Sequence, residues 1–148
     1  MIKYIVLFFL TLSMINAEEK NQDNYVKSEN IVINIDKKLM WQDNPDTLVY
    51  TSNWTLAKEY CKTLSLNGYT DWKLPSIKVL QEIVDISKFD PAINENFKHT
   101  QPSSYWSSSA DMKYKNNAWY VGFKTGATFK DSKDYNCYVR CVRTRFKK

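Results

Sequence analysis

NCYVRCVRTRFKK, residues 136–148, is typical of a β-strand and contains two of the three cysteines of the chain. Cys137 and Cys141 lie four residues apart, and Cys61 lies far upstream. Such a pair can hold a metal, exchange electrons or form a disulfide with another cysteine. The redox state of the compartment and the geometry of the strand decide between these roles. The role of the cysteines in turn decides whether the sequence predicts an enzyme.

The amino-terminal residues predict export. MIKYIVLFFLTLSMINAEEK has one basic residue, Lys3, an apolar run over 4–12, and aliphatic and small residues at Ile15 and Ala17, where a signal peptidase requires them. We expect a signal peptide over residues 1–17, cleaved after Ala17. An uncleaved anchor is the alternative, but the apolar run is well short of the roughly 20 residues that span a bilayer. The predicted location is the periplasm or the cell surface and exterior, where disulfides are the default state of cysteine.

The charge of the chain is distributed unevenly. The 148 residues include 21 Lys and Arg against 16 Asp and Glu, a formal net charge of +5. From Cys137 onward there is no acidic residue, and the basic residues are Arg140, Arg143, Arg145, Lys147 and Lys148. Nucleic acid is a poor partner for an exported protein, so this basic strip predicts an anionic partner of another kind.

The first part of the exported chain predicts a lead-in followed by two strands. Residues 18–30 are polar without periodicity, although Tyr25 and Val26 can begin a strand. IVINIDKKLMWQD predicts two short strands about a polar turn at 36–38. We therefore expect one domain over residues 31–148, a length that buries a substantial core.

Two helices are predicted next. Residues 53–68, NWTLAKEYCKTLSLNG, begin with a capping residue, Asn53, and end with Gly68 in the left-handed position. The apolar stripe of this helix includes Cys61, which therefore faces the core. Ser76 is expected to cap a second helix through IKVLQEIVDIS.

The second half of the chain predicts antiparallel strands. A long loop precedes YWSSSA, which begins as a strand and is expected to break at its serines. NAWYVGFKTGATFK predicts a hairpin with Gly126 in the turn region. Helices early and strands late indicate an α+β fold, with two helices packed on one side of a twisted antiparallel sheet that carries long loops.

Strand geometry limits what the two late cysteines can do. Cys137, Val139 and Cys141 share one face of a strand, and four residues of strand span roughly 13 Å. Disulfide partners need Cα atoms within about 7 Å, so Cys137 and Cys141 neither bridge each other nor share a metal in a regular strand. Cys61 is left for one of them, and Cys141, which is deeper in the strand, is favoured. Cys137 is then a free, buried thiol.

Seven phrases in order relate the chain to a known family. The phrases, in chain order, are LMWQD, WTLAKEYC, GYTDWKLPS, VLQEIVD, YWSSSA, AWYVGFKTG and YVRCVR. They run through most of the exported chain. With them the chain resembles the C-terminal domain of the Legionella collagen-like adhesin, formerly a domain of unknown function, which is widespread in exported bacterial proteins.

The resemblance implies a fold and a disulfide. The family is similar to the C-type lectin fold and to the related fold of formylglycine-generating enzymes. In that fold a cysteine of the first helix commonly pairs with one of the last strand, which agrees with a Cys61–Cys141 bond. Cys137 lies outside the recurring phrase, so the resemblance implies nothing about it.

Catalytic and metal sites are not indicated. The serines of YWSSS have no suitable base nearby, since the only histidine, His99, lies in a polar loop. The number of acidic residues does not exclude a catalytic pair of carboxylates for glycosidic cleavage. Asp85, Asp90 and Glu95 are close in sequence and are the candidates. No set of three or four metal ligands is visible, the lectin-type calcium motifs are replaced by QPSS and YWSS, and we expect neither metal nor cofactor. CYVRCVRTR is loosely similar to the two-cysteine strand of formylglycine-generating enzymes, but its spacing is one residue shorter.

We therefore expect a non-enzymatic exported binding or adhesion module. The alternatives are a structural subunit of a periplasmic or surface assembly and a small formylglycine-generating-type modifying enzyme. The expected partner is an anionic polysaccharide or another surface protein, and the oligomeric state is left open. The candidate contact residues are basic or aromatic and come from the loop DMKYKNNAW and from the basic strip: Lys113, Tyr114, Lys115, Arg143, Arg145, Lys147 and Lys148.

Overall fold

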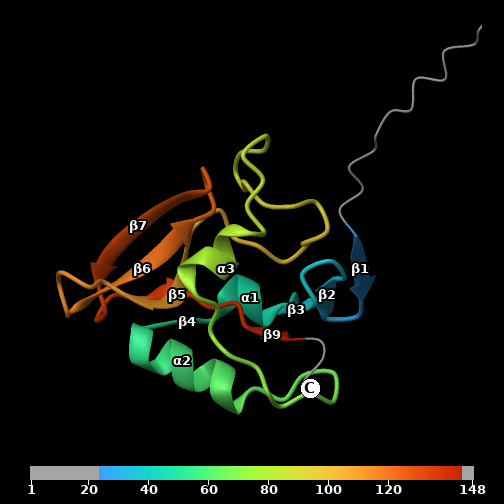
Figure 1. The fold of residues 1–148 in the computed structure, drawn as a ribbon, viewed down its shortest axis with the longest axis horizontal. Coiled ribbons are helices and arrows are strands. Elements are labelled where there is room, and N and C mark those ends of the chain that lie inside the picture. Colours follow the sequence, from blue (N-terminus) through green and yellow to red (C-terminus); the bar gives the residue numbers. More distant parts are fainter. Residues whose placement is uncertain (1–23, 145–148) are drawn as a thin grey trace, which may run out of the picture.

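A computed structural model describes residues 24–144 of the chain (Figure 1). The predicted signal peptide and the candidate residues Arg145, Lys147 and Lys148 lie outside the described residues. Within residues 24–144, no helix has the length and apolar character needed to cross a membrane.

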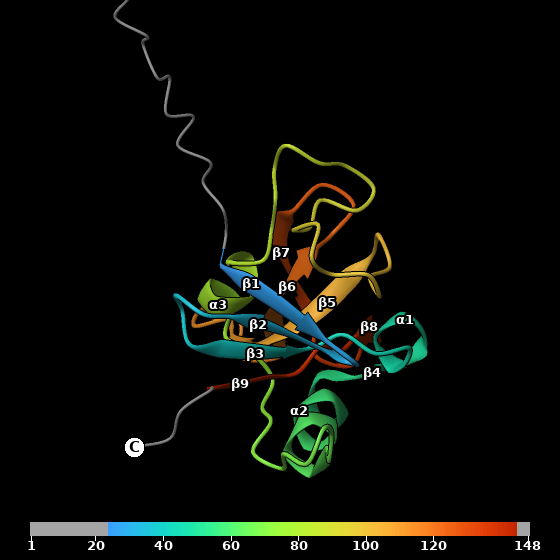
Figure 2. The same ribbon diagram turned by 90° about the vertical axis from the view of Figure 1, so that its right-hand side faces the viewer.

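The predicted α+β class is confirmed, with the strands divided between two sheets. The first sheet has the order β1-β2-β3-β9 and is antiparallel throughout. Its edges, β1 and β9, lie on opposite sides of β2 and β3 in Figure 2. The bounds are Tyr25–Ser28 for β1, Ile31–Asn34 for β2, Leu39–Gln42 for β3 and Val142–Thr144 for β9.

The second sheet has the order β4-β8-β5-β6-β7 and contains one parallel pair, β5 with β8. The predicted hairpin is β6 and β7, in full antiparallel register. The strand β5 continues through the serines where a break was predicted, with a register shift against β6 between Trp106 and Ala110. The bounds are Thr51–Ser52 for β4, Ser104–Ala110 for β5, Asn117–Gly122 for β6, Ala127–Ser132 for β7 and Cys137–Tyr138 for β8.

Within residues 24–144, three short helices accompany the sheets. Their bounds are Asp46–Val49 for α1, Trp54–Thr63 for α2 and Ile77–Gln81 for α3. The predicted caps are confirmed, because Asn53 accepts from Leu56 N and Ser76 accepts from Val79 N. The predicted end of the first helix at Gly68 is wrong. Asn67 and Gly68 instead form a turn of their own, with φ of 50° and 78°, which closes a bridge between residues 66 and 69.

Within the part of the predicted lead-in that the structure describes, the alternative of a strand that begins at Tyr25 is confirmed. Tyr25–Ser28 pairs with Ile31–Asn34 as the edge strand β1, through a turn in which Asn30 has φ of 66°. The exposed Lys27 and Ser28 of β1 suit this position, because charged and polar side chains on an edge strand discourage its pairing with another chain.

The core has two parts, on opposite faces of the five-stranded sheet. One cluster contains Ala57 and Cys61 of α2 with Trp106 of β5. The other contains Leu80 of α3 with Tyr105, the neighbouring residue of β5. Because successive side chains of a strand point to opposite faces, α2 and α3 cover different faces, and the expected packing of both helices on one side is wrong.

The last stretch, residues 137–144, runs between these two clusters. Cys137, Val139 and Cys141 belong to the first cluster, whereas Tyr138 and Val142 belong to the second. The expected alternation is therefore present, although the stretch is divided into β8 and β9, which belong to different sheets.

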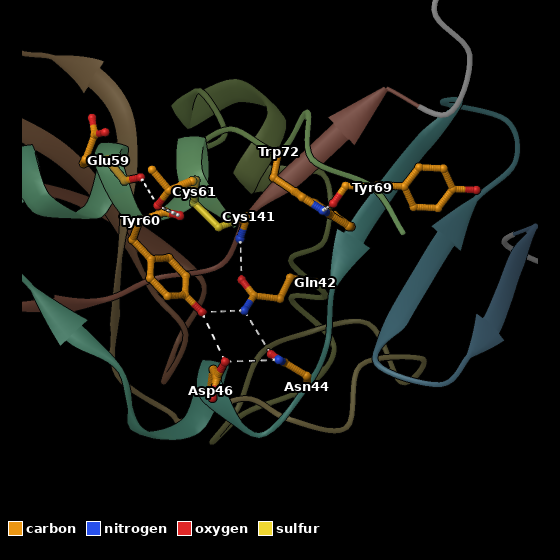
Figure 3. The surroundings of a disulfide bond; sticks show 10 residues. Gln42, Asn44, Asp46, Glu59, Tyr60, Cys61, Tyr69, Trp72 and Cys141 are labelled. Carbon is orange, nitrogen blue, oxygen red and sulfur yellow. Dashed lines mark hydrogen bonds between the residues drawn. A yellow bond between two sulfur atoms is a disulfide. The ribbon is translucent and has the colours of Figure 1, made fainter. Parts of the chain in front are cut away.

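The predicted disulfide is confirmed. Cys61 of α2 and Cys141, which precedes β9, are bonded with a Cα–Cα distance of 5.4 Å (Figure 3). Cys137 is free and buried. A disulfide that ties a helix to the last stretch fits a secreted protein.

A polar network holds the chain around the disulfide (Figure 3). Gln42 accepts from the backbone N–H of Cys141 at 3.1 Å and donates to Asn44 at 2.9 Å and to the hydroxyl of Tyr60 at 3.0 Å. Asn44 and Tyr60 both donate to Asp46, at 3.3 and 3.4 Å. Burial raises the pKa of Tyr60 to about 12, so its hydroxyl remains a donor. The network fastens β3, α1 and α2 to the residue that carries the disulfide.

Candidate binding site

Arg140, the first arginine of the basic strip, is fully buried. Its guanidinium forms an ion pair with Asp43 at 3.0 Å and donates to the backbone oxygen of Gln42 at 2.7 Å. Its second terminal nitrogen donates to the backbone oxygen of His99 at 2.6 Å and to the hydroxyl of Thr100 at 2.7 Å. Arg140 thus joins the long loop around residue 99 to β3 and does not reach solvent.

Asp43 is held in its ionised form by the same arrangement. Burial by itself raises the pKa of Asp43. The Arg140 guanidinium and the backbone N–H groups of Lys98 and His99 lower it by more than burial raises it, so the pKa lies below the ordinary 3.8. The two backbone donors are at 3.0 and 3.1 Å. The pair is therefore a buried charge pair with additional hydrogen bonds, the only form in which such a pair is tolerated in a core.

Arg143, one of the predicted contact residues, is occupied by partners within the protein. Its guanidinium donates to both carboxylate oxygens of Asp71, at 2.6 and 3.3 Å, and lies 3.9 Å from the centre of the Tyr69 ring. Its side chain is only 7% exposed. Asp71 reaches it because Lys73 and Val142 exchange two backbone hydrogen bonds, which place residues 71–73 beside β9. The prediction of a basic strip without a compensating acid is wrong at this position.

The connection between β5 and β6, residues 111–116, contains the other candidate residues. We call it the lysine–tyrosine loop. Asp111 receives a hydrogen bond from the backbone N–H of Lys113 at 2.9 Å, and its own N–H donates to Asn117 at 2.9 Å. The N–H of Asn117 donates to the backbone oxygen of Tyr114 at 2.8 Å. The loop is therefore held by hydrogen bonds within the chain.

Unpaired positive charge is found on this loop. Among residues 24–144, Lys113 and Lys115 form no ion pair, whereas the nearby Lys130 is neutralised by Asp111 at 3.0 Å. Tyr114 is 53% exposed, and the ammonium of Lys113 lies 5.1 Å from its ring centre. The two lysines and Tyr114 line a shallow hollow of about 420 Å³ with Asn116 and Asn117.

Three residues that the sequence did not single out extend this site. The ammonium of Lys133 donates to the backbone oxygen of Lys115 and lies 4.5 Å from the centre of the Trp54 ring. Lys58 lies 3.9 Å from the same ring, whose N–H donates to the backbone oxygen of Ser107 at 2.7 Å. Trp54 and Lys58 are four residues apart on α2, a spacing that places them on one helix face and was visible in the sequence.

We call this set the lysine–aromatic surface. Its members come from α2, the lysine–tyrosine loop and the segment after β7: Trp54, Lys58, Lys113, Tyr114, Lys115 and Lys133. Figure 1 shows the start of α2 and the end of β7 at the left side of the view, whereas β9 lies farther to the right. Arg143 therefore lies apart from this surface, so the candidate residues that the structure describes do not all belong to one site.

Two groups considered for catalysis, the free thiol and the serines of β5, are in structural environments that do not favour reactivity. Burial, with a smaller effect of Asp131, raises the pKa of the Cys137 thiol to about 12, which disfavours the thiolate. The hydroxyl of Ser107 donates to the backbone oxygen of Trp119, and that of Ser109 accepts from the N–H of Ile77. Within the described part of the chain, no three His, Cys, Asp or Glu side chains gather in a way that holds a metal ion.

Comparison with known families adds one finding. The family model described as the Lcl C-terminal domain matches residues 30–143, from the turn before β2 into β9. This range includes both cysteines of the disulfide, the lysine–tyrosine loop and Arg143. No curated protein matches the chain.

Proposed function

Because the chain belongs to the Lcl C-terminal domain family, which indicates an adhesin-like module, we propose that it is an exported, non-enzymatic module that binds anionic polysaccharide. The proposed contact residues are those of the lysine–aromatic surface. Arg143 is excluded from them because Asp71 and Tyr69 already occupy its guanidinium.

The observation that carries this proposal is the pair of lysines without acidic partners beside an exposed ring. Lys113 and Lys115 flank Tyr114 on an ordered loop, so binding a sulfate or carboxylate costs little loop entropy. The ring of Tyr114 offers an amphipathic surface for a sugar. Each exposed contact is weak, so the affinity depends on several lysines at once and falls as salt screens charges beyond about 10 Å at 0.1 M.

Two features support a non-enzymatic role over a formylglycine-type enzyme. That chemistry requires reactive thiols, and Cys141 is bonded to Cys61. The remaining thiol, Cys137, is buried, and its pKa is raised to about 12. Neither group is available as a nucleophile near neutral pH.

The test compares retention on immobilised heparin, a sulfated polysaccharide. We expect the variant Lys113→Ala/Lys115→Ala to elute at a clearly lower salt concentration than the wild type. The matched control is Lys78→Ala/Lys124→Ala, which removes the same charge from two exposed lysines, one on α3 and one in the turn between β6 and β7.

The same column tests the rest of the basic strip. Lys147→Ala/Lys148→Ala is expected to elute with the control. If both lysine pairs and the control shift equally, retention reflects net charge and the proposed surface is wrong. If only Lys147→Ala/Lys148→Ala shifts, the carboxyl terminus is the binding surface.

A further inference from the structure

The two faces of the β6–β7 hairpin carry different kinds of side chain. In the register of this hairpin, Tyr120 lies opposite Phe129 and Asp131 lies opposite Ala118. Side chains two apart on a strand share a face, so Phe129 and Asp131 lie with Tyr120 on one face, and Lys130 lies on the other. The face with Asp131 carries aromatic rings and a carboxylate.

A hollow of about 280 Å³ opens on the face with Asp131. Residues from β5, β6 and β7 and from the segment that leads into β8 line it: Ser104, Tyr120, Asp131, Tyr135, Asn136 and Cys137. Phe129 stacks on Tyr120 with ring centres 5.6 Å apart and extends the aromatic wall. Tyr135 and Phe129 are 60% and 48% exposed, so the wall is accessible from solvent.

One charged group lies in this hollow. Asp131 takes part in none of the ion pairs formed by residues 24–144, and its carboxylate accepts a hydrogen bond from the N–H of the adjacent Ser132 at 2.8 Å. Burial raises the pKa of both Tyr120 and Cys137, with Asp131 adding to each shift, so both groups are neutral at physiological pH. The hollow thus presents a single negative charge in a protein that has an excess of lysine and arginine.

We propose that this hollow is a second binding site, which takes a ligand that carries an ammonium group. Asp131 pairs with the ammonium, and Tyr120 and Tyr135 line the hollow beside it with aromatic rings, which are common in sites for cations. The amide of Asn136 and the hydroxyl of Ser104 supply further oxygen acceptors. An anionic glycan is repelled by the same carboxylate, so this site does not depend on the function proposed for the lysine–aromatic surface.

The volume limits the ligand to a small group. About 280 Å³ is below the usual size of a drug-like site, and it suits a free amine or a single lysine side chain of a partner protein. Both sources present the same ammonium.

The test is an NMR titration of the oxidised protein with n-butylammonium at 150 mM salt. We expect saturable shifts of the backbone amides of Asp131, Asn136 and Cys137, and none with n-butanol, which has the same chain without the charge. Asp131→Asn, which preserves the shape of the side chain, is expected to weaken binding by about tenfold to a hundredfold, because a hydrogen bond to a charged group is lost. Asp134→Asn is the control, since it removes an exposed carboxylate that does not line the hollow.

Tyr135→Ala provides a second variant, because this exposed ring can be removed without disturbing the core, and it is expected to weaken binding severalfold. Unchanged affinity in Asp131→Asn, equal weakening in Asp134→Asn, equal shifts with n-butanol, or no saturable shift with the amine each overturn the proposal. A lysine-containing peptide that binds more tightly than n-butylammonium assigns the site to a partner protein, whereas equal affinity assigns it to free amines.

Discussion

The buried pair of Arg140 and Asp43 offers the sharpest test of how this fold is held together. Asp43→Ala removes a carboxylate that receives the Arg140 guanidinium and two backbone N–H groups, from Lys98 and His99. The arginine is then left fully buried without its counter-charge.

The expected loss is large because the charge that remains has no access to water. Removing one member of a buried ion pair costs about 3–5 kcal/mol, which is a large share of the roughly 5–15 kcal/mol that stabilises a typical domain. For a domain of this length, each kcal/mol lowers the melting temperature by roughly 3–5 °C, so we expect a decrease of about 10–20 °C. Asp43→Asn, which keeps the shape and loses the charge, is expected to cost about 2 kcal/mol.

The effect depends on pH in a defined direction. The folded pKa of Asp43 lies below 3.8, so in acid the unfolded chain binds more protons than the folded protein. The stabilisation from Asp43 is therefore complete above about pH 5 and is lost as the pH falls through the folded pKa. The difference in unfolding free energy between wild type and Asp43→Asn is expected to shrink over this acid range.

Urea unfolding with the disulfide intact measures these differences. Asp134→Ala is the control, because Asp134 is exposed and is expected to change stability by less than about 0.5 kcal/mol. In the double variant with Arg140→Met, the loss is expected to be smaller than the sum of the two single losses by about 1–3 kcal/mol. A cost below about 1 kcal/mol for Asp43→Ala, or strict additivity in the double variant, refutes the assignment of Arg140 and Asp43 as a coupled buried pair.

Three further predictions follow from the fold. Replacing both Cys61 and Cys141 by Ser opens a crosslink with a sequence separation of 80 and is expected to cost about 4.5 kcal/mol on the chain-entropy model, measured by urea unfolding; a cost near zero contradicts it. Gly126 and Gly68 have similar φ angles of 80° and 78°, but a Cβ at residue 126 would lie only 2.5 Å from the side chain of Val84, whereas one at residue 68 meets open space. Gly126→Ala is therefore expected to lower the melting temperature more than Gly68→Ala, and equal effects argue against the contact with Val84. Cys137 is expected to react with iodoacetamide at pH 8 far more slowly in the folded protein than in urea, because burial raises its pKa to about 12; equal rates show that the thiol is accessible.

Local features of this fold were predictable from the sequence. Asn53 and Ser76 were identified as caps because capping depends on residues within one turn of the helix. The β6–β7 hairpin followed from alternation over a short span. The Cys61–Cys141 bond was predicted from the helix stripe, strand parity and the family resemblance together, because the predicted export made a disulfide the default state of cysteine.

The candidate site was predicted only in part, because charges that are close in sequence need not be free in space. Lys113, Tyr114 and Lys115 lie together on one loop, and their grouping is local. Trp54 and Lys133 join them only through the packing of α2 beside the end of β7.

The features that could be predicted and those that could not differ in how far apart along the chain the interacting residues lie. By itself the sequence determined the caps and the hairpin, since these depend on neighbours along the chain, whereas the pairing of Cys61 with Cys141, 80 residues apart, was predicted only with the added help of the family resemblance. Only the tertiary structure decided that Arg140 and Arg143 are interior groups. Their partners Asp43 and Asp71 lie 97 and 72 residues away, and a buried guanidinium is stable only where the fold brings a carboxylate to it.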